Sequence, residues 1–301
     1  MTGKLPVERA IADAYRFAFA RFPSVLGTIW LPYLVLVLIA LGLIRLAAPD
    51  VPQMLTTGEL DLGAGMELLR LAVLVAVFAF IIGAMVTVDL QRKAMGTKMG
   101  PRYVFFSLSA PVWRMAGASF LVAIVVGIVV VLSVLLCVGI WSAAAALGPV
   151  AGLIRVVAVL AIVAIVIYIA LRLTFFLPAV VVAENSIGLE RAWILGGHNF
   201  WRILLVTIAV LFPIAIVFHL VSWALLGPVP SLHELGGQGA LKALIRAGTI
   251  QYGAKGYLIL FLEIVERILL IGVFNGAIAS AYLAVRSDSP AAAVPPPVPA
   301  Q

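Results

Sequence analysis

Residues 188–202 gather most of the side chains in this sequence that could perform chemistry. The segment reads GLERAWILGGHNFWR and lies between two long apolar runs. It combines a carboxylate, an imidazole and two guanidinium groups with three aromatic rings: Glu190, His198, Arg191 and Arg202 beside Trp193, Phe200 and Trp201. Such a set suits a catalytic or binding site, but Trp and Arg also gather where a chain meets a membrane surface.

The catalytic interpretation finds little support elsewhere in the sequence. The three histidines are scattered at His198, His219 and His233. There is no phosphate-binding loop, dinucleotide fingerprint, nucleophile elbow or HExxH metal motif. The single cysteine, Cys137, lies inside an apolar run and is interpreted as an inert buried thiol. We therefore expect a chain that is not an enzyme, with no catalytic residue, no metal site and no cofactor.

The composition is that of an integral membrane protein. Of the 301 residues, 64% are hydrophobic and only 11% are charged, whereas soluble domains carry about 25% charged residues. The net charge is +7, but the basic residues cluster at the ends of apolar runs. This distribution indicates membrane orientation and attraction to anionic lipid rather than binding of nucleic acid.

Six apolar runs are long enough to cross a bilayer, which takes about 20 residues. Each must be helical, because lipid offers no hydrogen-bond partner to an unpaired backbone group. The first run is longer than the hydrophobic part of a signal peptide, so we expect it to remain as a span. The runs cover residues 24–46, 69–90, 117–147, 153–177, 203–226 and 257–285. Most Lys and Arg residues fall on the side of the termini, which predicts that both termini are cytoplasmic.

The N-terminal region repeats features of the opening segment. VERA at 7–10 matches LERA at 189–192, and each copy leads into a span that contains a proline, Pro32 or Pro213. A weaker third copy near 101–114 shares only its Trp-Arg pair. We therefore predict one all-α transmembrane domain, a helical bundle over residues 1–286 built from three repeated two-span units, followed by a tail. The units cover about 5–91, 101–177 and 187–285, and the Pro/Ala-rich cytoplasmic tail at 287–301 is expected to be disordered.

Each unit is expected to begin with an amphipathic helix that lies at the cytoplasmic surface of the membrane. In the first unit, apolar residues from Val7 to Phe22 recur at helical spacing, and Arg9, Asp13 and Arg16 lie mostly off that stripe. This arrangement turns the arginines toward lipid phosphate. In the last unit we expect the glycine pair at 196–197 to interrupt the helix.

Three ionisable residues within or beside the spans each allow two interpretations. Asp89 is interpreted as half of an ion pair with Arg92 or Lys93, or as part of a site. Arg172 extends its side chain to the interface, or it pairs with Glu184 or Glu190 and holds the interfacial helix in place. His219 makes a hydrogen bond between helices, or it serves a proton-linked role.

The last span carries two further features. Glu263 and Arg267 are four residues apart and can pair, whereas Glu266 has no partner on its own face; these carboxylates belong to a projecting helix or to the mouth of a pathway. Gly272, Gly276 and Ser280 repeat every four residues and form a face for close helix packing, against another span or a second subunit.

Residues 171–206 resemble a broad family of bacterial membrane proteins, the glycerophosphoryl diester phosphodiesterase membrane domain, together with related inner-membrane families. The matching pattern is Arg172, then Phe176 and Pro178, then Glu184, then the pair Trp201-Arg202 that leads into the next span. The resemblance implies a membrane domain in a bacterial inner membrane. It does not imply phosphodiesterase activity, because the soluble catalytic domain that gives the family its name has no counterpart here.

These observations favour a non-enzymatic inner-membrane protein that organises a membrane complex or associates with lipid or envelope components. The alternative is a transporter or permease for a small or amphiphilic solute. The expected partners are membrane lipids, anionic ones in particular, and a further copy of the chain or another member of a membrane complex. The candidate residues for lipid headgroups or the interface are Arg172, Glu190, Arg191, Trp193, Trp201 and Arg202, and those for a pathway are His219, Glu263 and Glu266.

Overall fold

The computed structural model describes residues 4–47, 62–97, 106–144, 150–226 and 253–287. Within these ranges the chain is helical and contains no strand, which confirms the all-α fold. The helices are α1 (Val7–Ala20), α2 (Phe22–Ala47), α4 (Leu62–Ala94), α5 (Ala110–Ala144), α6 (Ala151–Thr174), α7 (Leu177–Glu184), α8 (Leu189–Leu226) and α10 (Gly253–Ser287).

Six of these helices are long and apolar enough to cross a membrane, which confirms the expected number of spans. They are α2, α4, α5, α6 continuing into α7, α8 and α10. The spanning stretches are Phe22–Ala40, Leu69–Ala94, Ala110–Ala143, Ala151–Glu184, Leu189–Leu225 and Phe261–Arg286. Each contains most of one predicted apolar run, because run length in the sequence reports directly on helix length at 1.5 Å per residue.

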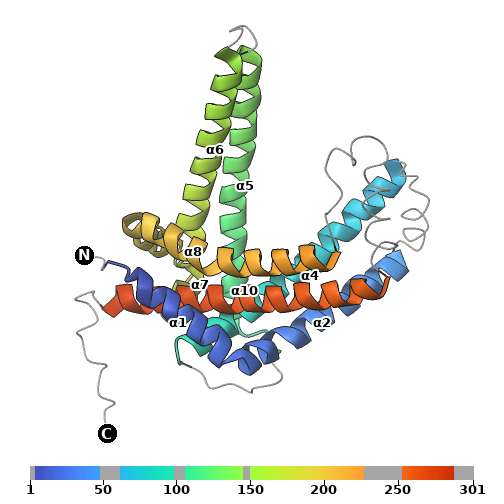
Figure 1. The fold of residues 1–301 in the computed structure, drawn as a ribbon, viewed down its shortest axis with the longest axis vertical. Coiled ribbons are helices and arrows are strands. Elements are labelled where there is room, and N and C mark those ends of the chain that lie inside the picture. Colours follow the sequence, from blue (N-terminus) through green and yellow to red (C-terminus); the bar gives the residue numbers. More distant parts are fainter. Residues whose placement is uncertain (1–3, 48–61, 98–105, 145–149, 227–252, 288–301) are drawn as a thin grey trace.

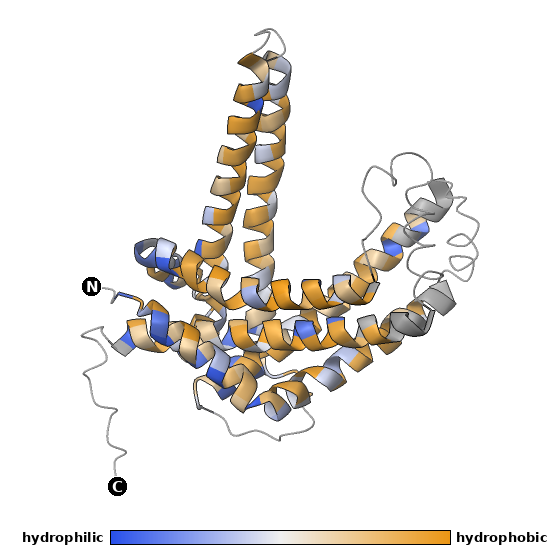
Figure 2. Ribbon diagram, in the orientation of Figure 1, coloured by the Kyte–Doolittle hydropathy of each residue, from blue (hydrophilic) through white to orange (hydrophobic). Residues whose placement is uncertain are grey.

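The spans form two arms that diverge from a common junction (Figure 1). One arm is the hairpin of α5 and α6, which pack along each other and stand away from the rest. The other arm contains α2, α4, α8 and α10. Both arms are apolar over most of their length, as expected of surfaces that face lipid (Figure 2).

The short helix α7 is buried at the junction of the two arms. It packs on α4, α5, α8 and α10, and the residues from Phe175 to Val181 are all buried. Pro178 lies in its first turn, where proline is favoured because no hydrogen bond is lost. The helix ends at Asn185, which adopts the left-handed conformation with φ of 54°.

Helix α8 does not break at the glycine pair, so that expectation was wrong. It continues through Gly196 and Gly197 and is kinked at Asn199, where φ is −121° and ψ is 15°. The side chain of Asn199 explains the kink: its Oδ1 accepts a hydrogen bond from the Leu5 backbone N–H at 3.0 Å. The glycines instead allow close packing of α8 against α6, because a Cβ at position 196 would lie 2.7 Å from the backbone oxygen of Arg172.

The small-residue face of α10 packs against α1 and α2 of the same chain. A Cβ at Gly272 would lie 3.0 Å from Val25 Cγ1, and one at Gly276 would lie 3.1 Å from the Cα of Ala14. Ser280 Oγ donates a hydrogen bond to Asp13 at 2.9 Å. The sequence leaves open whether this face packs against another span or against a second subunit. In the structure it packs within one chain.

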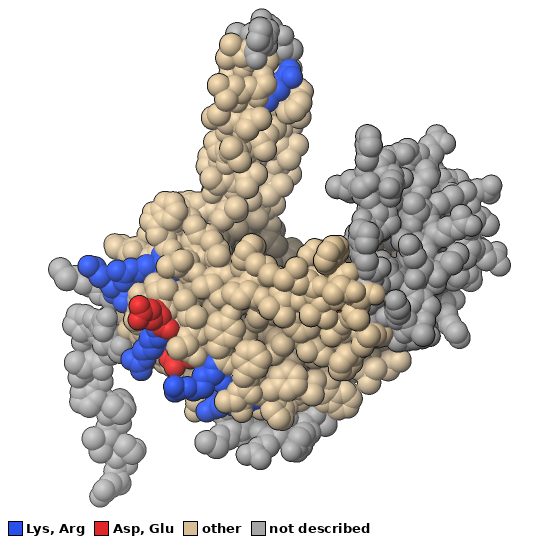
Figure 3. Space-filling model, viewed as in Figure 1, with Lys and Arg blue, Asp and Glu red and all other residues tan. Residues whose placement is uncertain are grey.

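Most of the charged side chains on the face seen in Figure 3 lie at one end of the molecule, at the lower left, and a further basic group lies near the tip of the α5–α6 hairpin. Helix α1 and the last turns of α10 lie together at this end. The start of the first span, which follows α1, and the end of the last span therefore lie at the same end of the molecule. An even number of spans requires this arrangement.

Candidate functional site

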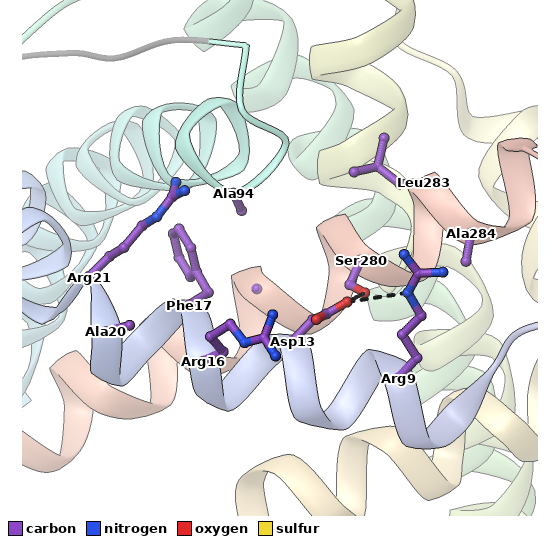
Figure 4. Close-up of a pocket in the computed structure, with 11 residues that line it drawn as sticks. Arg9, Asp13, Arg16, Phe17, Ala20, Arg21, Ala94, Ser280, Leu283 and Ala284 are labelled. Carbon is purple, nitrogen blue, oxygen red and sulfur yellow. Dashed lines mark hydrogen bonds and ion pairs between the residues drawn. The ribbon is translucent and has the colours of Figure 1, made fainter.

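A cleft of about 570 Å³ opens between α1 and α10 at the charged end of the molecule (Figure 4). We name it the α1–α10 cleft. Its lining comprises Arg9, Asp13, Arg16, Phe17, Ala20 and Arg21 from α1 and the residue after it, Ala94 from α4, and Gly276, Ser280, Leu283 and Ala284 from α10.

Helical spacing places these residues in the cleft. Arg9, Asp13 and Arg16 are four and three residues apart, so they share one face of α1. Small residues recur on α10 at Gly276, Ser280 and the position four residues further on. Because they project little from the helix, they leave open the space that larger side chains would fill.

The cleft carries an excess of positive charge: three guanidinium groups against one carboxylate, a net charge of +2 from 3 − 1. The carboxylate of Asp13 lies 3.7 Å from Arg9 Nε and accepts the hydrogen bond of Ser280. Arg21 donates through Nη1 to the carbonyl of Lys93 at 3.1 Å. Among the described residues, no side chain or carbonyl pairs with Arg16, whose guanidinium is exposed.

The lining as a whole is amphiphilic. Guanidinium groups bind phosphate oxygens through paired N–H donors and are weakly hydrated, so they tolerate an interface. Phe17 and Leu283 provide apolar surface beside them. The cleft can therefore hold an anionic group, such as a phosphate ester, that is joined to an apolar body.

A buried polar cluster on α2 and α4 adjoins the cleft through Lys93, whose carbonyl accepts the hydrogen bond of Arg21. Asp89 is fully buried and Lys93 is 5% exposed; their Oδ2 and Nζ atoms lie 2.9 Å apart. Lys93 also donates to Thr28 Oγ1 at 2.6 Å, and Thr28 donates to Asp89 at 3.0 Å. Of the two interpretations of Asp89, the structure displays the ion pair, with Lys93 as the partner, and it buries that pair rather than leaving it at the surface.

A second polar contact joins α4 to α10. The Nε2 atom of Gln91 donates to the backbone oxygen of Asn275 at 3.2 Å and to its Oδ1 at 2.9 Å. Both side chains are buried. The same two helices, α4 and α10, also contribute Ala94 and Gly276 to the lining of the α1–α10 cleft.

Arg172 is held within the protein and pairs with neither Glu184 nor Glu190, so the expected ion pair was wrong, although Arg172 does hold the start of α8. Its guanidinium carbon lies 3.8 Å from the ring centre of Trp193. Its Nε donates to the Trp193 carbonyl at 3.1 Å, and its Nη1 donates to the hydroxyl of Tyr168 at 2.6 Å. Arg172 therefore connects α6 to the start of α8.

The other arginines proposed for lipid contact also have protein partners. Arg191 Nε lies 3.6 Å from Glu184, which in turn accepts a hydrogen bond from Tyr282 at 3.0 Å. Arg202 donates to the carbonyl of Leu5 at 3.0 Å. The two remaining interface candidates, Glu190 and Trp201, are exposed on α8, and Trp201 is 76% exposed. None of these residues lines the α1–α10 cleft.

The proposed pathway residues are not brought together. His219 is exposed on α8, while Glu263 is exposed and Glu266 half-buried on α10. Within the described part of the chain, no ion pair joins Glu263 to Arg267. His198 is exposed with Nδ1 3.4 Å from the Ile194 carbonyl, and His233 lies outside the described residues.

The sequence predicts the α1 side of the cleft but not the α10 side. Arg9 and Arg16 were recognised as the polar side of an amphipathic helix, facing lipid phosphate. The opposite wall on α10 was recognised only as a packing face, because nothing local in residues 272–284 indicates that α1 would lie across it.

Tyr15 anchors α1 from its other side. Its hydroxyl donates to the carbonyl of Ala209 at 3.0 Å and lies 3.4 Å from that of Val210. Burial raises the pKa of Tyr15 above its ordinary value. A phenol is already protonated at neutral pH, so the raised pKa keeps this donor protonated to more alkaline pH.

The fold and the cleft together define an integral membrane protein with a basic, amphiphilic cleft at the end of its spans. Comparisons with protein-family models, with curated proteins and with solved structures found no match to this chain. The resemblance to the glycerophosphoryl diester phosphodiesterase membrane domain stays a prediction, and we infer the function from the cleft.

Proposed function

We propose that this is a non-enzymatic membrane protein that holds an anionic lipid headgroup in the α1–α10 cleft, on the cytoplasmic side of a bacterial inner membrane. The observation that carries the proposal is the cluster of three guanidinium groups against one carboxylate. Arg16 has no protein partner within the described ranges and is free to bind an anion.

The position of the cleft along the spans supports a lipid headgroup over a dissolved anion. Arg21 immediately precedes the spanning stretch of α2, which begins at Phe22. Ala94 is the last residue of the α4 stretch, and the α10 stretch ends two residues after Ala284, at Arg286. Three span ends therefore meet at the cleft, at the depth where lipid phosphates lie.

In this proposal the lipid supports association with the envelope or with a membrane complex. A bound headgroup would bridge α1 to α10 and fix the interfacial helix to the spans. Arg172, Arg191 and Arg202 would then act inside the protein, where their partners hold α6, α7, α8 and the N-terminal segment together.

The buried pair of Asp89 and Lys93 favours a second candidate, transport of a small or amphiphilic solute. Ionisable groups within spans are rare and commonly serve a pathway. Here the two groups pair with each other, and each makes a hydrogen bond with Thr28. We favour headgroup binding over transport, because the arginines face an open cleft whereas Asp89 and Lys93 are buried.

The test compares lipids retained by the wild type and by Arg16→Gln after purification in mild detergent, using native mass spectrometry. Arg286→Gln is the matched control, since Arg286 is exposed on α10 outside the cleft. We expect phosphatidylglycerol binding to fall at least about tenfold in the cleft variant, the loss of about 1.4 kcal/mol, and to persist in the control. Equal retention by the two variants would overturn the proposal.

A further inference from the structure

A second cavity, of about 420 Å³, lies where the two arms separate. We name it the inter-arm cavity. Its walls come from α4, α5, α6, α7 and α10: Thr87, Met115, Ser119, Val122, Ala123, Val126, Ala170, Thr174, Leu177, Pro178, Phe274, Asn275 and Ile278. The volume falls within the range of small-molecule sites, about 300–1,000 Å³.

This cavity is separate from the α1–α10 cleft. Asn275 and Ile278 face it from α10, whereas Gly276 and Ser280 face the cleft. At about 100° per residue, these two pairs point to nearly opposite sides of the helix. A ligand in one space therefore does not extend directly into the other.

The lining selects against charge. It contains no ionisable side chain, and two of its four polar side chains, Thr174 and Asn275, hydrogen-bond within the protein. Thr174 Oγ1 donates to the Ala170 carbonyl at 2.7 Å, and Asn275 Nδ2 donates to the Ile271 carbonyl at 2.9 Å. Because a buried charge would find no partner here, the ligand must be apolar.

The cavity is elongated and reaches the surface. Ser119, Ala123 and Val126 line it over eight residues of α5, a rise of about 10 Å. Ala123 and Thr174 are exposed. These residues all belong to spanning stretches, so the medium that reaches them in a membrane is hydrocarbon rather than water.

We propose that the inter-arm cavity binds an acyl chain of a membrane lipid, which enters from the hydrocarbon between the two arms. Small side chains at positions 119, 123 and 170 leave a slot of chain-like shape. An apolar space of this size is costly to leave empty, and lipid is the apolar material at its mouth. The site recognises the chain and not the headgroup, so it is independent of the proposed headgroup function.

The test uses a phosphatidylcholine and a phosphatidylglycerol that each carry a diazirine on the acyl chain, with the protein in lipid nanodiscs. Illumination followed by peptide mass spectrometry maps the labelled residues. We expect both lipids to label the cavity walls on α5, α6 and α10 several-fold more than the outer hairpin surface. Uniform labelling along the hairpin would overturn the proposal.

Substitutions distinguish the cavity from general lipid contact. Ala123→Leu fills the slot, and Ala161→Leu adds the same bulk to an exposed position of α6 outside it. We expect several-fold less cavity labelling in the first variant and wild-type labelling in the second. If Ala123→Leu fails to fold, Ala170→Val is the second filling variant. A filled variant with wild-type labelling of the cavity would refute the site.

Arg16→Gln separates this proposal from the headgroup proposal. It removes a cation from the cleft and leaves the inter-arm cavity untouched. We expect unchanged acyl-chain labelling in that variant. Loss of cavity labelling there would show that both observations report one lipid, which would contradict a separate chain site.

Discussion

At the scale of single residues, Arg172 shows how a charge near a span end can serve the protein rather than the lipid. Its position near the end of an apolar run is evident in the sequence. Its partner is not, because Trp193 is 21 positions away and the contact requires α8 to cross α6 at the glycine pair. Arginine over a tryptophan face contributes about 0.5–2 kcal/mol.

The first prediction concerns this contact. A Cβ at Gly197 would lie 2.8 Å from the guanidinium carbon of Arg172, so Gly197→Ala should displace the side chain from Trp193. We expect a loss of about 0.5–2 kcal/mol, the contribution of the Arg172–Trp193 contact, measured by thermal unfolding in detergent. Gly127→Ala is the control, since its Cβ meets nothing within 4 Å. Equal stability of the two variants would contradict the role given to Gly197.

The second prediction concerns the buried ion pair. Lys93→Met deprives the fully buried Asp89 of its countercharge, at a cost of about 3–5 kcal/mol. Combining it with Asp89→Leu should recover much of that loss, because no buried charge remains. Chemical unfolding of both variants in detergent measures the difference. A double variant no more stable than Lys93→Met would refute the pair as the source of the effect.

At the scale of the element, α10 was predicted in more detail than any other helix, yet its environment was not. The spacing of Gly272, Gly276 and Ser280 indicated close packing. The partner depends on α1 folding back across α10, a contact between residues more than 250 positions apart. The kink of α8 escaped prediction for the same reason, since Asn199 acts through Leu5.

The third prediction tests the packing of α1 on α10. Gly276→Leu should push α1 away, because even a Cβ there would lie 3.1 Å from Ala14 Cα and Phe17 Cβ. We expect trypsin to cleave faster at the arginines of α1 and the variant to lose about 1–3 kcal/mol of stability. Gly139→Leu, on the exposed part of α5, is the matched control. Unchanged proteolysis of Gly276→Leu would exclude the contact.

At the scale of the whole molecule, the sequence predicted the number of spans but not the divergence of the two arms. Apolar run length determines how far a helix extends. The direction of α5 and α6 depends on their contacts with α4, α7 and α8 at the junction. Uniformly apolar helices carry no sequence signal for that direction, because every face can lie against lipid.

The fourth prediction concerns topology. In a Cys137→Ser background, Lys4→Cys and Ser142→Cys place single thiols at opposite ends of the spans. Because an odd number of spanning stretches separates the two positions, a membrane-impermeant maleimide should label only Ser142→Cys in intact cells. Labelling of both thiols from outside would contradict the six-span arrangement with cytoplasmic termini.

The most direct test of the headgroup site is hydrogen–deuterium exchange of the intact protein in nanodiscs with and without phosphatidylglycerol. We predict slower exchange of residues 9–21 and 276–284 in the anionic lipid, and loss of that protection in Arg16→Gln. The inter-arm cavity should be unaffected by headgroup charge. Equal exchange of residues 9–21 in anionic and neutral lipid would show that the α1–α10 cleft does not bind an anionic headgroup.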